Sequence, residues 1–287
     1  MNHRPLTALT VVALVGALAV GCSSTPTTQT SNSGGVTLVA PGILTVCTNP
    51  PFKPMEFVDT TGATVGFDID LMKYAADKMG LGTNFIQTDF TQITSGAAMA
   101  AQKCDVGASS ITITEARKQA VTFSAPYFAA TQALMAKSDA GITGLASLKG
   151  KKLAVETDTT GADYANENAA ANGYTVVVFE DGGTALNAVL AGRADACLID
   201  RAIVYSFVAD NPTTSVITEF QTGEQYGFVA STDANGQALM AQVNDALTAA
   251  DADGTYFNLY KKWIDPNATS ANLPVASSAP TDATPSS

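Results

Sequence analysis

An arginine stands in the first turn of a predicted helix, directly after a strand that ends in hydroxyl side chains. Residues 109–117 read SSITITEAR. A cation at this place faces the positive end of the helix dipole, which costs about 0.3–1 kcal/mol, so another interaction should hold it there. Ser110, Thr112 and Arg117 together offer two hydroxyl donors and a planar guanidinium, which suits a carboxylate. The alternative on this segment alone is a solvated Arg117 after a helix cap at Thr114.

The segment that ends at Ser110 shares its pattern with a second segment ninety residues later in the chain. Residues 89–110 and 179–200 both read as a strand end, a helix, a basic residue, an aspartate, an apolar strand and a polar tip. The two tips are Ser110 and Asp200. Ligands of open α/β sheets bind at the carboxyl ends of strands. If the two units face each other, a carboxylate site at Arg117 opposes the acid at Asp200, and a zwitterion satisfies both.

The loop of residues 157–161, TDTTG, precedes another predicted helix. Its backbone N–H groups and hydroxyls could also hold a carboxylate, because the N-terminus of a helix attracts anions. An ordinary helix cap is the alternative interpretation, since threonine before a helix commonly accepts one of the first backbone N–H groups.

These residues must be positioned by an α/β fold, because short β-branched runs alternate with helical stretches, a pattern typical of largely parallel sheets. Strands are expected at 43–48, 84–88, 105–110, 152–156, 175–179 and 196–200. Helices are expected at 68–79, 92–102, 115–120, 162–171, 184–191, 202–209, 237–249 and 255–263. The flanking segments 23–35 and 268–287 are too polar to bury a core and are expected to be linkers or tails.

The N-terminus predicts export. One arginine precedes the apolar run 6–20, as in a signal peptide. Residues 18–22, LAVGC, resemble a bacterial lipobox, whose cleavage leaves Cys22 as a lipidated N-terminus on the outer face of the cytoplasmic membrane. An uncleaved membrane anchor is the alternative, which the short apolar run and the small residues before Cys22 disfavour.

Composition excludes several kinds of chemistry. The only histidine, His3, lies in the predicted signal, so the mature protein lacks Ser-His and Cys-His nucleophile pairs and histidine-ligated metals. Cys47, Cys104 and Cys197 show no metal-binding spacing, and at least one of them is unpaired. Their apolar surroundings indicate buried structural cysteines. No cofactor or metal is expected, and the net charge of −11 argues against nucleic-acid binding.

Five segments, in their order and spacing, resemble solute-binding family 3, the amino-acid-binding receptors of bacterial ABC importers. They are 49–57 (NPPFKPMEF), 66–71 (GFDIDL), 111–117 (ITITEAR), 148–155 (LKGKKLAV) and 254–263 (GTYFNLYKKW). The resemblance covers about residues 44–263. It implies a two-lobed type II periplasmic binding protein fold with two hinge crossings, near 129–136 and 224–231.

The resemblance also implies a division of the chain. It comprises a signal peptide at 1–21, a lipidated flexible linker at 22–35, lobe 1 at 36–130 plus 230–267, lobe 2 at 135–224, and a disordered tail at 268–287. Binding would close the lobes on the ligand and present a closed surface to a membrane permease with its ATPase subunits. A monomer is expected.

Several site residues follow from the resemblance. It implies that Arg117 pairs with the ligand α-carboxylate and that Ser110, Thr112 and Thr160 also bind this group. Asp200 would take the α-ammonium. Phe52 and Phe90 would form walls along the ligand side chain, and Asn49 and Glu156 would line its pocket. Core packing is the alternative for Phe52 and Phe90. Asp68 and Asp70 are expected to cap the following helix rather than to touch ligand.

Two positions bear on specificity. Several relatives that bind cationic ligands have Asp where this chain has Asn49, which disfavours a strongly basic ligand, while Glu156 would repel an acidic one. An uncharged polar amino acid such as glutamine or asparagine is therefore expected, with a basic amino acid next.

Two other functions share this fold. An exported cyclohexadienyl-type dehydratase would need a proton donor, for which Glu156 or Asp200 could serve, but the missing histidine argues against an enzyme. A ligand-sensing module would need a membrane span and an effector after Trp263, where we expect only a polar tail.

Overall fold

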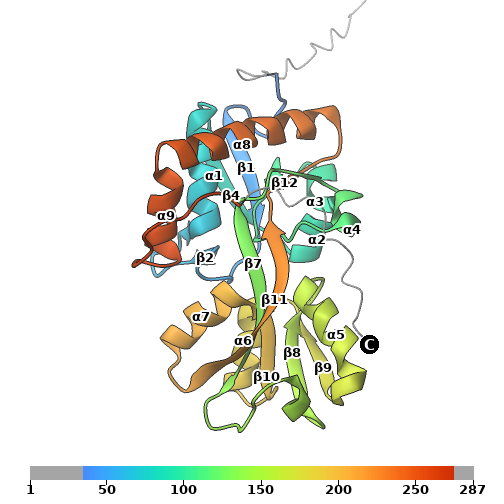
Figure 1. Cartoon of the computed structure of the whole chain (residues 1–287). Helices are drawn as coiled ribbons and strands as arrows, with labels where there is room; N and C mark the ends of the chain where they lie inside the picture. Colours follow the sequence, from blue (N-terminus) through green and yellow to red (C-terminus); the bar gives the residue numbers. More distant parts are fainter. Residues whose placement is uncertain (1–34, 275–287) are drawn as a thin grey trace, which may run out of the picture.

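The computed structural model describes residues 35–274, so the predicted signal peptide, Cys22 and the last residues of the tail lie outside the described part. Two α/β lobes lie one above the other in Figure 1, each built on its own five-stranded sheet. The expected α/β fold and its two lobes are confirmed.

The first lobe holds the sheet β4-β1-β5-β12-β6. Its strands are β1 Ile43–Thr48, β4 Gly82–Gln87, β5 Val106–Gly107, β6 Thr122–Phe123 and β12 Val229–Ala230, with the hairpin β2 Phe57–Val58 and β3 Thr64–Val65 beside it. Its helices are α1 Phe67–Lys78, α2 Phe90–Thr94, α3 Ala97–Ala100, α4 Glu115–Lys118, α8 Ala234–Ala252 and α9 Thr255–Trp263. β1 pairs in parallel with β4 and β5, whereas β12 runs antiparallel to its neighbours, so the sheet is mixed.

The second lobe holds the sheet β11-β7-β10-β8-β9. Its strands are β7 Phe128–Lys137, β8 Lys152–Glu156, β9 Thr175–Phe179, β10 Ala196–Asp200 and β11 Thr214–Tyr226. The helices α5 Thr160–Asn172, α6 Gly182–Leu190 and α7 Arg201–Asp210 and the short 3-10 helix Leu145–Leu148 complete it. β8 runs parallel to both β9 and β10, so the carboxyl ends of these strands meet at one edge of the sheet.

The two lobes are joined by the long strands β7 and β11, which pair antiparallel from Thr214 opposite Lys137 to Tyr226 opposite Phe128 and run between the lobes in Figure 1. The chain was expected to cross here, but neither segment was predicted as a strand. β7 reads FAATQALMAK, in which alanine and glutamine have low strand propensity, so its conformation depends on pairing with a distant segment.

Local structure corrects two expected elements. The helix expected at 92–102 is broken into α2 and α3, because Gly96 adopts a left-handed conformation with φ 75°. The strand expected at 105–110 shortens to Val106–Gly107, and Ser110 leaves the extended conformation with φ 49°. Residues 268–274 run along lobe 1, where Ala271 and Leu273 pack against the core.

Cys47, Cys104 and Cys197 are buried, as expected for structural residues. Cys47 and Cys104 form a disulfide between β1 and the segment before β5, and Cys197 is a free thiol in β10. Within residues 35–274, none of the helices combines the length and apolar character needed to cross a bilayer.

Candidate functional site

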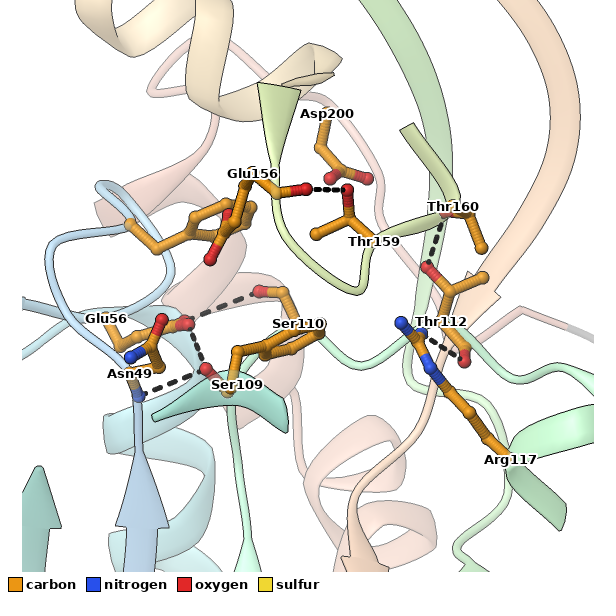
Figure 2. Close-up of a pocket in the computed structure, with 12 residues that line it drawn as sticks. Asn49, Glu56, Ser109, Ser110, Thr112, Arg117, Glu156, Thr159, Thr160 and Asp200 are labelled. Atoms are coloured by element: carbon orange, nitrogen blue, oxygen red, sulfur yellow. Dashed lines mark hydrogen bonds between the residues drawn. The ribbon is translucent and has the colours of Figure 1, made fainter. Parts of the chain in front are cut away.

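A pocket lies where the two lobes meet (Figure 2). It is lined by Asn49, Phe52, Glu56, Phe90, Ser109, Ser110, Thr112, Arg117, Glu156, Thr159, Thr160 and Asp200. All nine ligand-binding residues expected from the sequence therefore line one pocket. Glu56, Ser109 and Thr159 were not expected there.

Arg117 extends from α4 across the pocket toward the second lobe. Its Nη1 donates to the carbonyl oxygen of Thr112 at 2.9 Å, and its Nη2 donates to the carbonyl oxygen of Asp158 at 2.6 Å. Its guanidinium carbon lies 5.2 Å from the centre of the Phe90 ring. Thr114 does cap the helix by accepting from the Arg117 N–H at 3.1 Å, but the guanidinium is not simply solvated. Burial lowers the pKa of Arg117.

The hydroxyl-bearing turn before Arg117 is held by a buried aspartate. Ser110 has φ 49°, and its backbone N–H donates to Asp68 Oδ2 at 2.8 Å. The Tyr127 hydroxyl donates to the same carboxylate at 2.7 Å. Asp68 was expected to cap α1, but Gly66 occupies the N-cap without a side-chain bond. Asp68 therefore holds the backbone of a pocket residue without lining the pocket itself. Burial raises the pKa of Asp68 to about 7.

Asp70 also differs from expectation. Its carboxylate accepts from Lys262 Nζ at 2.7 Å and from Trp263 Nε1 at 2.9 Å, so it ties α1 to α9 instead of capping α1. These bonds place Asp70 in the packing of the first lobe, away from the residues that line the pocket.

Glu56 is the only acid among the three lining residues that sequence reasoning missed. It is fully buried, and its carboxylate accepts from Ser109 Oγ at 2.8 Å and from Ser110 Oγ at 3.4 Å. Burial, and then the nearby carboxylate of Asp68, raise its pKa well above the usual range. The available signal was an acid inside the apolar run PMEF, because a carboxylate is rarely buried without a partner.

Asn49 lies beside this acid at the end of β1. Its backbone N–H donates to Ser109 Oγ at 3.1 Å, and its Nδ2 donates to the Thr88 carbonyl at 3.0 Å. Its buried Oδ1 accepts no hydrogen bond within the described residues. The amide is thus oriented by its donors while an acceptor remains open.

The second lobe contributes two carboxylates, each at the end of a strand. Glu156 ends β8 and is 2% exposed, and its Oε2 has no hydrogen-bond partner among the described residues. Burial raises its pKa well above the usual range, and the charge of Asp200 adds to this. Asp200 ends β10 and accepts from Gln132 Nε2 at 3.2 Å. Burial, followed by the charge of Glu224, raises its pKa to about 7.

The N-terminus of α5 completes the pocket. Thr159 caps this helix by accepting from the Ala162 N–H at 3.0 Å, so the loop does contain the ordinary cap. Thr160 Oγ1 lies 3.5 Å from Thr112 Oγ1 of the first lobe. The loop therefore serves both as a cap and as part of the pocket wall.

The two phenylalanines combine both roles considered for them. Phe52 and Phe90 are each 7% exposed, and each packs into a hydrophobic cluster while also lining the pocket. They give the pocket apolar walls between the charged groups.

The charges of the pocket are divided between the lobes. Lobe 1 supplies the guanidinium of Arg117 and the buried acid Glu56, and lobe 2 supplies Asp200 and Glu156. In Figure 2, Arg117 lies on one side of the pocket, and Glu156 points toward the side that holds Glu56. A ligand with separated charges would contact both lobes at once. Among residues 35–274, no group of His, Cys, Asp and Glu side chains is arranged to hold a metal ion.

Comparison with known proteins agrees with this geometry. Residues 44–266 match the model of the bacterial extracellular solute-binding proteins, family 3. The chain is 31% identical over 216 residues to ABC transporter arginine-binding protein 1 of Escherichia coli K12, covering 74% of this chain and 87% of the relative. It is 33% identical over 210 residues to the glutamine-binding protein GlnH of Bacillus subtilis, covering 71% and 74%.

A solved structure extends this similarity to three dimensions. An ancestral arginine-binding protein bound to arginine superposes with a TM-score of 0.72 at 37% identity, covering 77% of this chain and 98% of the other. At this level of identity, the similarity includes the sequence as well as the two-lobed fold.

Proposed function

The chain belongs to the bacterial extracellular solute-binding proteins, family 3, and from this premise we propose that it binds a basic amino acid between its lobes. The ligand α-carboxylate would bind Arg117. This cation takes part in no ion pair within residues 35–274, so it can pair with an anionic group of the ligand. The α-ammonium would meet Asp200. Because these groups come from different lobes, a zwitterion favours the closed arrangement.

The single observation that most supports a basic side chain on the ligand is that Oε2 of Glu156 has no hydrogen-bond partner among the described residues. A buried carboxylate oxygen without a donor is costly, and a cationic ligand would supply both the charge and the hydrogen bond. The open Oδ1 of Asn49 adds a second acceptor to the same pocket. A guanidinium offers five donors and no acceptor, which suits such a lining.

Glu56 shifts the preference away from the uncharged polar ligand favoured by the sequence. Its buried carboxylate makes the side-chain pocket more acidic than Asn49 and Glu156 alone imply. Both acids line the same pocket, and the charge of Glu156 contributes to the raised pKa of Glu56. A cationic side chain would relieve this repulsion, whereas a neutral amide would need the acids to remain protonated.

A thermal-shift screen of the full chain against arginine, lysine, histidine, glutamine, asparagine and glutamate tests the proposal. A ligand at a hundred times its dissociation constant adds about 2.7 kcal/mol to the free energy of unfolding. We expect the largest shift with arginine or lysine. A larger shift with glutamine would refute the basic preference but retain amino-acid binding, and no shift with any amino acid would refute both.

The setting of this binding is also a proposal. We expect the closed protein to deliver its ligand to an ABC permease from the outer face of the cytoplasmic membrane, held there as a monomer by a lipid on Cys22, which lies outside the described residues. Cys22→Ala should move the protein from the membrane fraction to the soluble fraction. Retention in the membrane fraction would contradict the lipid anchor.

A further inference from the structure

Asp158 lies in the turn between β8 and α5 and holds an unusual backbone conformation. Its φ is 58°, in the left-handed region that glycine adopts without strain and other residues adopt at a cost. Glycine would therefore fit the backbone conformation of this turn with less strain than aspartate does. Aspartate tolerates this region better than most other residues, because its short polar side chain can form hydrogen bonds nearby.

Two contacts from Asp158 reach the first lobe. Its Oδ2 accepts from Thr94 Oγ1 at 2.5 Å, and its carbonyl oxygen accepts from Arg117 Nη2 at 2.6 Å. Thr94, which is 4% exposed, ends the helix that begins at Phe90, and the ring of Phe90 lies beside the guanidinium of Arg117.

One residue of the second lobe thus contacts the guanidinium and the helix that carries its aromatic neighbour. Among the charged groups that act on Arg117, the nearby charge of Asp158 has the largest effect and raises the pKa that burial lowers. Asp158 itself does not line the pocket.

We infer that Asp158 is a positioning residue that latches the closed lobes and orients Arg117 for the ligand carboxylate. This inference rests on the proposed amino-acid binding. Both contacts join different lobes, so they are lost when the lobes separate. The latch should therefore slow ligand release, which requires opening, and should leave capture by the open form almost unchanged.

The test measures association and dissociation rate constants of the full chain for L-arginine by stopped-flow or surface plasmon resonance. Asp158→Gly removes the carboxylate while suiting the left-handed backbone, so the ligand-free variant should melt no lower than the unsubstituted protein. We expect dissociation to become about tenfold faster, equivalent to about 1.4 kcal/mol, with association changed less than about twofold.

Two further variants separate the hydrogen bond from charge and from folding. Asp158→Asn keeps an acceptor oxygen in a residue that tolerates the left-handed region, so it should lose less affinity than Asp158→Gly. Thr94→Val removes the donor from the other lobe. In combination with Asp158→Gly it should add little further loss, because both substitutions break the same bond.

Asp163→Asn is the matched control. Asp163 is exposed in the first turn of α5, also acts on the charge of Arg117, and makes no side-chain hydrogen bond to the first lobe among the described residues. Its removal costs the same formal charge, and both rate constants should stay unchanged.

The outcomes distinguish the latch from the function on which it rests. Equal dissociation rates for Asp158→Gly and the unsubstituted protein would overturn the latch alone. An effect of Asp163→Asn as large as that of Asp158→Gly would also overturn it, since charge and not contact would then explain the loss. Failure of the unsubstituted protein to bind arginine would instead overturn the proposed basic ligand and the role of the latch in holding it.

Discussion

Replacing Glu156 with glutamine should affect the ligand-free and ligand-bound protein in opposite directions. The substitution keeps the shape of the side chain but removes an acidic group that is 2% exposed and has an unpartnered Oε2. Without ligand, the ionised acid lowers the free energy of unfolding, because burial and the charge of Asp200 disfavour its ionisation. With a basic ligand, the same acid becomes the partner of the cation.

The magnitudes follow from these surroundings. A charge-assisted hydrogen bond contributes about 1.5–3 kcal/mol, so Glu156→Gln should weaken arginine binding by roughly 10- to 150-fold. A buried ionised carboxylate without a partner costs about 1–3 kcal/mol or more, so the ligand-free variant should melt roughly 2–12 °C higher at neutral pH.

The gain in stability should depend on pH. The folded-state pKa of Glu156 is raised above its unfolded value, so folding becomes less favourable as the pH rises from the unfolded pKa toward the folded one. Below about pH 4 both states hold the proton, and the difference in melting temperature between variant and unsubstituted protein should vanish.

Calorimetry of arginine binding and thermal melts between about pH 3 and 8 provide the assay. Glu180→Gln is the matched control, because Glu180 is exposed in the same lobe and its loss removes the same charge. A variant that binds arginine as tightly as the unsubstituted protein would refute the role of Glu156 in ligand recognition. A ligand-free variant that melts lower at neutral pH would refute the argument from its burial.

Three further predictions follow from the pocket and the core. Arg117→Ala should abolish detectable arginine binding in calorimetry, because the ligand carboxylate loses its cation, and retained affinity would exclude the proposed orientation. Arginine affinity should fall about tenfold per pH unit below about pH 7, where Asp200, with its pKa raised to about 7, takes up a proton and no longer balances the ammonium; an affinity that does not change between pH 5 and 7 would contradict this. Cys47→Ala with Cys104→Ala should lower the melting temperature by roughly 4–16 °C, because the disulfide spans 57 residues and such bonds contribute about 2–4 kcal/mol; an unchanged melting temperature would show that it contributes little.

Elements with a strong local pattern were predicted closely from the sequence. β1, β8, β9, β10 and α9 have the expected bounds, because their apolar residues follow the period of a strand or helix. β7 and β11 were missed as strands because neither has such a pattern over its length. Their conformation comes from pairing with each other across about eighty residues of chain, which short-range propensity does not record.

The residues of the pocket also differ in how far the sequence revealed their roles. Arg117 was noticed because a cation stands where the helix dipole disfavours one, and Asp200 because it ends a strand of a repeated unit. Glu56 and Asp68 differ, since the acid inside the apolar run indicates burial but not its partner, and an acid at a helix start has an ordinary explanation as a cap. Only in the folded protein does Asp68 accept from the N–H of Ser110, and only there does Glu56 face the pocket.

The sequence by itself thus indicated the α/β class and the opposed charges of Arg117 and Asp200, because each carries a local signal, and the family resemblance supplied the other expected pocket residues. The tertiary structure decided what those residues face. It placed Glu56 and Glu156 in the lining of one pocket, and it brought Asp158 against Thr94 and Arg117. Such pairings join residues far apart in the chain, and burial sets the charge preference of the pocket only after the lobes have folded and met.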